Sequence, residues 1–235
     1  MNKVACLTFG TVATGMIALQ LNCAATAYNP SLDFSLNSNP NGVWSYGYST
    51  SLGGSMTLHQ EHAQLDMGLY SWRTSTSGYD VPGIFYNPTE STIVYTPNPE
   101  ANMVWNPHQT SLHPGPNGEF SILRFTPPED GRFQLQGQFS SVDQYYGAQT
   151  DVHILRNGAS IFEGYIAGPT STAPFNDSLQ LAVGDQLDFV VGIGLYSFGW
   201  DSTGLDLVVT LVPEPSALGL LSLGLLLLRR FHAKP

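Results

Sequence analysis

Aromatic residues beside polar side chains are the feature of this 235-residue sequence that most clearly indicates a chemistry. Flat Trp and Tyr rings can cover the apolar C–H faces of a sugar, while amide, imidazole and carboxylate groups bind its hydroxyls. The candidate rings beside predicted loops are Trp72, Trp105, Tyr145, Tyr146 and Trp200. Their polar neighbours are Asn106, His108, His113, Gln144 and Asp201. Together they indicate non-covalent sugar binding, and the alternative for each ring taken singly is a place in the core.

Calcium is the metal that the composition favours, because hard oxygen ligands are plentiful. The candidate ligands are Asp143, Asp151, Asp201 and Asp206, helped by backbone carbonyls. The sequence has no Asp-x-Asp-x-Asp-Gly loop, so a structural calcium stays one alternative beside no cofactor at all.

Catalytic motifs find less support. The sequence has no Gly-x-Ser-x-Gly nucleophile motif and no glycine-rich phosphate loop. His59-Gln60-Glu61-His62 spaces its histidines three apart instead of four, so we expect solvated loop histidines and not a zinc site. A glycosidase needs two carboxylates at a set separation, which a sequence does not give. A secreted polysaccharide hydrolase or lyase therefore remains the enzymatic alternative.

Short strands must position these residues, because apolar and polar residues alternate with a period of two. The predicted strands are 32–36, 44–48, 67–72, 84–86, 92–96, 120–125, 133–139, 151–155, 161–166, 179–183, 187–191 and 205–211. Asn157-Gly158 predicts a type I′ hairpin turn. Five prolines between residues 97 and 118 predict one long irregular loop. This spacing predicts an all-β, two-sheet antiparallel β-sandwich, with binding concentrated in the loops 97–117 and 196–203.

The N-terminal segment 1–27 has the features of a signal peptide for Sec export. Lys3 precedes an apolar-leaning stretch, and Ala25-Thr26-Ala27 is a small-x-small cleavage site that would leave Tyr28 first. Both cysteines, Cys6 and Cys23, lie inside this segment. The exported domain is therefore expected to contain no disulfide and no thiol ligand.

The C-terminal segment 212–235 begins with Val212-Pro213-Glu214-Pro215. A leucine-rich helix is predicted over 216–228, and Arg229 and Arg230 follow it. These arginines favour the cytoplasmic side of a membrane. The order of these elements resembles the bacterial PEP-CTERM sorting signal. That resemblance implies processing by an exosortase, transient anchoring in the inner membrane, and release to the cell surface or extracellular matrix. The apolar run is about 20 Å long as a helix, which is short for a permanent membrane span.

The remaining segment, 28–211, forms one acidic domain. Without the four basic residues and one acidic residue of the two terminal segments, the totals of 8 and 18 leave 4 basic and 17 acidic side chains, a net charge of −13. Such a surface disfavours nucleic acid as a partner.

The sequences NPNGVWSYGY (39–48), LHPG (112–115), LRFTPPEDG (123–131), TDVHIL (150–155) and VGDQLDFVVG (183–192) resemble a jelly-roll module similar to carbohydrate-binding modules. The resemblance implies a jelly-roll fold and no catalytic residue. We therefore expect an exported surface or exopolysaccharide-associated protein with a non-catalytic glycan-binding or matrix domain. The alternatives are the secreted hydrolase or lyase and a purely structural matrix protein.

Overall fold

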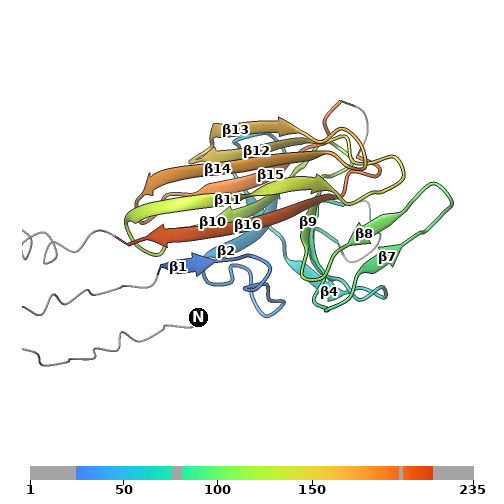
Figure 1. Cartoon of the computed structure of the whole chain (residues 1–235), viewed down its shortest axis with the longest axis horizontal. Coiled ribbons are helices and arrows are strands. Elements are labelled where there is room, and N and C mark those ends of the chain that lie inside the picture. The colour runs from blue at the N-terminus through green and yellow to red at the C-terminus, as the bar shows by residue number, and fades with distance from the viewer. Residues whose placement is uncertain (1–24, 76–80, 196–197, 214–235) are drawn as a thin grey trace, which may run out of the picture.

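The computed structural model of the chain describes residues 25–75, 81–195 and 198–213 (Figure 1). These residues form an all-β protein in which two antiparallel sheets pack face to face, so the predicted fold class is confirmed. Within the same ranges, no helix is long and apolar enough to cross a bilayer.

The larger sheet contains eight strands. In spatial order, seven of them are β14 (Thr172–Leu181), β11 (Gly131–Ser141), β16 (Thr203–Val212), β9 (Thr110–His113), β6 (Gly83–Tyr86), β5 (Tyr70–Arg73) and β4 (Glu61–Gln64). The eighth, β1 (Thr26–Tyr28), pairs with the C-terminal part of β16.

The second sheet contains six strands. Their order is β13 (Ala159–Tyr165), β12 (Asp151–Arg156), β15 (Leu187–Val191), β10 (Phe120–Phe125), β2 (Trp44–Ser49) and β3 (Thr57–Leu58). A separate hairpin joins β7 (Ile93–Tyr95) to β8 (Met103–Trp105).

The last eight strands have the jelly-roll order. The row β9-β16-β11-β14 belongs to one sheet and the row β10-β15-β12-β13 to the other, so successive strands mostly alternate between sheets. Two nested Greek keys of this kind define a jelly roll. The strand order therefore confirms the predicted jelly-roll topology.

The main core lies between the sheets because strand residues alternate in direction. Phe133, Leu135 and Phe139 of β11 are fully buried. The ring of Phe133 meets that of Phe125 from the other sheet at 5.8 Å between centroids, edge to face. The period-two pattern that predicts these strands is thus the pattern that fills the core.

A second apolar cluster lies outside this core. It contains Leu65, Leu69, Phe85, Trp105 and Val142. The β7–β8 hairpin contributes to it and extends beyond the sheets, at the opposite end of the sandwich from β1 and the C-terminal end of β16 (Figure 1). This appended part of the domain forms the candidate site described below.

Two predictions about elements are wrong. Residues 32–36 form no strand, because Asn29 Oδ1 accepts the backbone N–H groups of Ser31 and Leu32 and holds the chain in a turn. The predicted loop 97–118 contains β8 and β9, and β9 pairs with both β6 and β16. Its prolines lie before, between and after these strands and not within them, which is why the strands can form.

The predicted hairpin at Asn157-Gly158 is confirmed. Both residues have positive φ, 51° and 81°, as a type I′ turn requires.

The two ends of the described domain lie side by side, since Thr26 is opposite Leu211 in the sheet. The predicted cleavage site after Ala27 falls within β1. Tyr28 itself packs on Phe125 at 5.4 Å. At the other end, Val212 is opposite Arg132. Residues 1–24 of the predicted signal peptide and residues 214–235 of the predicted sorting segment, including Glu214, Pro215, Arg229 and Arg230, lie outside the described residues.

Candidate functional site

A surface pocket of about 550 Å³ opens between the appended hairpins and the loop that leads into β16. The turn between β4 and β5, the strand β6, the β7–β8 hairpin and residues 198–202 supply its walls. The lining residues are Leu65, Met67, Leu69, Phe85, Tyr95, Pro97, Asn98, Met103, Trp105, His113, Phe198, Gly199, Trp200 and Ser202. Both loop regions expected from the sequence to hold the site contribute to this pocket.

The walls of the pocket are mostly apolar. No Asp, Glu, Lys or Arg is among the lining residues of the described part of the chain. Trp105 is buried, and its Nε1 donates a hydrogen bond of 2.7 Å to Ser111 Oγ behind the wall. Asn98, His113 and Ser202 are the polar side chains that reach the pocket.

Three rings form a group, the aromatic tip, which consists of the exposed Tyr145 and Tyr146 and the partly buried Trp200. Tyr145 and Tyr146 are 54% and 45% exposed and meet edge to face at 4.8 Å. Tyr146 lies 6.2 Å from Trp200. Since Trp200 also lines the pocket, the tip and the pocket are continuous.

Trp200 has an uncommon backbone conformation, with φ of 71°. This left-handed region is unfavourable for a bulky side chain and persists where the surrounding structure fixes it, often at binding sites. The conformation supports a functional role for this loop.

The loop that carries the two tyrosines is held from below by a buried carboxylate. Asp143 Oδ1 accepts the backbone N–H groups of Tyr145, Tyr146 and Gly147 at 2.8, 2.9 and 3.1 Å. Gly147 is required here: its φ is 77°, and a Cβ would lie 2.1 Å from the carbonyl carbon of Gly168. The backbone of the tip is therefore held in one conformation before a ligand binds, so little conformational entropy is lost on binding.

Asp201 follows Trp200 and is almost completely buried. Its Oδ1 accepts the Gln149 N–H at 3.0 Å, while its second oxygen has no hydrogen-bond partner. Burial raises the pKa of Asp201 to about 7; the negative charge of Asp151 adds to the rise and the Gln149 N–H opposes it. Asp201 is thus a buried support of the tip and not an exposed sugar ligand.

No three of the four predicted calcium ligands form one metal site within the described residues. Asp206 lies on the exposed face of β16, 3.3 Å from Gln138. Asp151 accepts hydrogen bonds from His153 and the Gly194 N–H, which outweigh burial and lower its pKa. Across the described residues, no group of three or more His, Cys, Asp or Glu side chains could hold a metal. A calcium site built partly from carbonyl oxygens stays a prediction.

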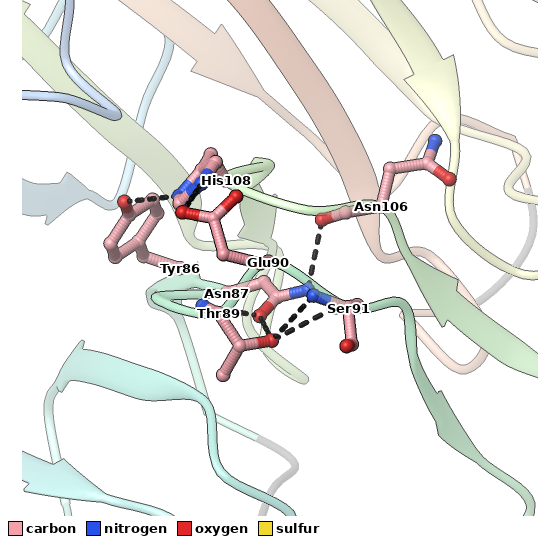
Figure 2. Close-up of polar contacts among 7 residues, drawn as sticks. All are labelled: Tyr86, Asn87, Thr89, Glu90, Ser91, Asn106 and His108. Atoms are coloured by element: carbon pink, nitrogen blue, oxygen red, sulfur yellow. Dashed lines mark hydrogen bonds and ion pairs between the residues drawn. The ribbon is translucent and has the colours of Figure 1, made fainter.

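A polar network fixes the base of the β7–β8 hairpin (Figure 2). Asn87 is fully buried, and its Nδ2 lies 2.8, 3.2 and 2.9 Å from the carbonyl oxygens of Ser91, Trp105 and Asn106. Its Oδ1 accepts the N–H and hydroxyl of Thr89. Asn106 therefore contributes through its backbone, and its own side chain points away from Asn87 in Figure 2.

His108 belongs to the edge of the same network. Its Nδ1 is 3.2 Å from the Tyr86 hydroxyl and its Nε2 is 3.1 Å from Glu90. Burial raises the pKa of Tyr86, and Glu90 adds to the rise, so the phenol keeps its proton. The imidazole tautomer decides which group donates in the contact between Tyr86 and His108. This chain of contacts is structural and does not activate a nucleophile.

The structure brings together some of the predicted site residues and separates others. Trp105, His113 and Trp200 line the pocket, and Gln144 is exposed beside the tip, with its backbone N–H bonded to Asn102 O at 2.7 Å. Trp72 is buried between Tyr46 at 6.1 Å and His62 at 4.7 Å, outside the pocket. It therefore belongs to the core.

Sequence reasoning missed several members of the site. The apolar lining residues Phe85, Met67 and Met103 give no signal that separates them from core residues. Asn87 did give a signal, because the sequence Asn-Pro-Thr after a strand is typical of a turn.

No protein-family model matches the sequence, and no curated protein does so. Several solved structures show similarity. CBM51 from Clostridium perfringens GH95, in complex with methyl-galactose, is 14% identical, with 79% of this chain and 99% of that chain covered and a TM-score of 0.37. A CBM4 structure is 10% identical, with 70% and 100% covered and a TM-score of 0.32. A family 35 carbohydrate-binding module from Clostridium thermocellum is 14% identical, with 51% and 87% covered and a TM-score of 0.27. At TM-scores this low, no ligand or activity is inferred, and the fold rests on the strand order above.

Proposed function

We propose that this protein is a non-catalytic glycan-binding module that binds sugars on its aromatic tip. The observation that carries the proposal is the exposed Tyr145–Tyr146 pair beside Trp200, held in place by three backbone hydrogen bonds to Asp143. Rings that are exposed and yet fixed can cover the C–H face of a pyranose at low entropic cost.

The preferred glycan is neutral. Segment 28–211 has 4 basic and 17 acidic side chains, from the sequence totals less those of the two terminal segments. A polysaccharide rich in uronate or sulfate would be repelled at low ionic strength. Gln144 lies next to the tip and offers amide groups for sugar hydroxyls.

The double variant Tyr145→Ala/Tyr146→Ala tests the proposal. We expect its retention in affinity electrophoresis on the best neutral polysaccharide of a panel to fall roughly tenfold, which is about 1.4 kcal/mol. The matched variant Tyr145→Phe/Tyr146→Phe keeps both rings and should retain most of the binding.

Absence of retention on every polysaccharide, with and without calcium, would reject the glycan proposal and favour a structural matrix role. Release of soluble products from a polysaccharide, abolished by one Asp or Glu substitution, would instead support the hydrolase or lyase.

We also propose that the C-terminal segment directs this domain through the inner membrane to the surface or matrix. The support is the order of Val212-Pro213-Glu214-Pro215, an apolar run and Arg229-Arg230 in the sequence. Sec export and an exosortase-type enzyme are the partners this proposal requires.

A structural calcium ion is the one cofactor we propose. Asp143 and Asp201 each keep one buried oxygen without a hydrogen-bond partner, and such an oxygen can be satisfied by a hard cation. At a calcium concentration 100 times the Kd, the free energy of unfolding should rise by about 2.7 kcal/mol. Equal melting temperatures in calcium and in a chelator would reject the site.

A further inference from the structure

We propose that the pocket beside the aromatic tip binds an uncharged hydrocarbon group, alkyl or aromatic, of a small amphiphilic molecule. This second binding activity does not depend on the glycan proposal. It rests on the chemistry of the pocket walls and not on the exposed tyrosines.

The size and lining of the pocket favour such a group. Protein interiors leave few voids larger than a water molecule, whereas this pocket measures about 550 Å³ and lies within the range of small-molecule sites. Its walls include Phe85, Trp105 and Leu69, all less than a tenth exposed. Water in such a space makes few hydrogen bonds, so a hydrocarbon group that displaces it gains the full hydrophobic effect.

Hydrogen bonds hold the β7–β8 side of the pocket in place. Asn87 ties the base of the β7–β8 hairpin to the neighbouring loop through the carbonyls of Ser91, Trp105 and Asn106. Trp105 is fixed further by its hydrogen bond to Ser111. The pocket is therefore preformed, and little entropy is lost when a ligand enters it.

Two methionines make the pocket tolerant of ligand shape. Met67 lies on the β4–β5 turn and Met103 on β8, and both line the pocket while remaining partly exposed. Unbranched thioether side chains adapt to irregular apolar ligands. The pocket should thus accept a class of hydrocarbon groups and not one specific molecule.

Polar residues at the pocket favour an uncharged polar head group on the ligand. Asn98 is exposed, its Oδ1 accepts the Glu100 N–H at 2.9 Å, and it lines the pocket together with Ser202. No Lys or Arg lies among the described lining residues to pair with an anionic group, and the one imidazole there, that of His113, has its Nδ1 2.7 Å from the Pro114 carbonyl oxygen. An uncharged polar head can therefore face Asn98 and Ser202, whereas a carboxylate would meet no lysine or arginine in an acidic protein.

The test is photolabelling of the full chain in lipid nanodiscs with an uncharged alkyl diazirine, with labelled peptides mapped by mass spectrometry. We expect labels on peptides that contain Met67, Met103 and Phe198. The variant Met67→Gln/Met103→Gln should lower this labelling roughly tenfold relative to the matched variant Met67→Leu/Met103→Leu. Peptides of residues 212–235 serve as the internal control, because labelling there should be equal in both variants.

Competition distinguishes the ligand classes. Octyl β-glucoside below its micelle concentration should suppress labelling of the pocket, methyl β-glucoside should not, and octanoate should compete less well. Equal competition by methyl β-glucoside would overturn the proposal, because the pocket would then bind the sugar ring. Equal labelling of the Gln and Leu variants, or no label on the pocket peptides, would also overturn it.

Two further variants separate this site from the glycan site and protect the test against misfolding. Tyr145→Ala/Tyr146→Ala should leave pocket labelling unchanged even where glycan retention is lost. Asn98→Asp lies at an exposed position and keeps the oxygen that accepts the Glu100 N–H. Asn98→Asp should make octanoate a still weaker competitor of pocket labelling and leave competition by octyl β-glucoside unchanged. Stronger competition by octanoate, or weaker competition by octyl β-glucoside, would contradict the proposal.

Discussion

The carboxyl group of Asp201 is one of the side chains that make the stability of the domain depend on pH. Its folded-state pKa is raised from 3.8 to about 7, chiefly by burial. Between these values the unfolded chain releases a proton that the folded chain keeps, so the contribution of Asp201 to stability falls as pH rises from about 4 to about 7 and is constant above that.

Asp201→Asn should remove this dependence while an oxygen still accepts the Gln149 N–H. The free energy of unfolding of the variant minus that of the original protein should rise by about 2–4 kcal/mol between pH 4 and pH 7. Urea unfolding of both proteins at several pH values measures this difference. Parallel pH profiles would show that Asp201 ionises normally in the fold.

The comparison with a variant is needed because His59 acts in the opposite direction. It is 1% exposed, stacks on Tyr48 at 5.6 Å, and burial lowers its pKa from 6.5 to about 3. Its contribution to stability is complete above pH 6.5 and is lost as pH falls toward 3. The Asp201→Asn difference cancels this effect.

His59 also shows what a sequence leaves open at the residue scale. The spacing of His59 and His62 predicts solvated loop histidines, and this prediction is wrong for His59 because it is buried beside Tyr48. His59 lies outside a regularly alternating strand, so its burial depends on contacts with distant segments and not on a local pattern. The exposed Tyr145 and Tyr146, in contrast, follow from a local turn fixed by Asp143.

At the scale of elements, the β7–β8 hairpin depends on one side chain from outside it. Asn87→Asp keeps the acceptor for Thr89 and replaces the donor toward three carbonyl oxygens with a carboxylate. We expect a loss of about 2–3 kcal/mol in the free energy of unfolding. Amide hydrogen exchange in residues 93–95 and 103–105 should accelerate more than in β11.

Thr89→Val is the control for that variant. It removes only hydrogen bonds made by the exposed hydroxyl of Thr89 and should cost less than about 1 kcal/mol. Unchanged exchange of the hairpin in Asn87→Asp would mean that other contacts hold it.

Elements with a regular pattern could be predicted, and those created by distant pairing could not. Residues 133–139 alternate between apolar and polar residues up to Gly137 and lie within β11, and β10 has the predicted bounds. The strand β9 lies among prolines and contains polar residues, and it exists because β6 and β16 flank it. Part of the pocket wall therefore lies in a segment that the sequence predicts to be irregular, and it could not be predicted from that segment alone.

At the scale of the whole molecule, the sorting proposal makes its own prediction. Glu214→Gln, or the pair Arg229→Ala/Arg230→Ala, should leave full-length protein in the membrane fraction, because the processing site or the orientation signal is lost. Immunoblots of membrane and culture medium give the measurement. Lys234→Ala is the control for a general loss of positive charge, and shedding of the Glu214 and arginine variants at the normal rate would contradict the proposal.

The strand β16 links the two ends of this molecule. It runs for ten residues from Thr203, just after the loop of Trp200, to Val212, where the proposed sorting segment begins. Ten residues of strand measure roughly 33 Å. A domain held at its C-terminal end therefore displays the aromatic tip several Debye lengths from its attachment point, since that length is about 8 Å at physiological ionic strength. The fixed charges of the envelope are screened at this distance, and ligand choice is left to the domain's own surface.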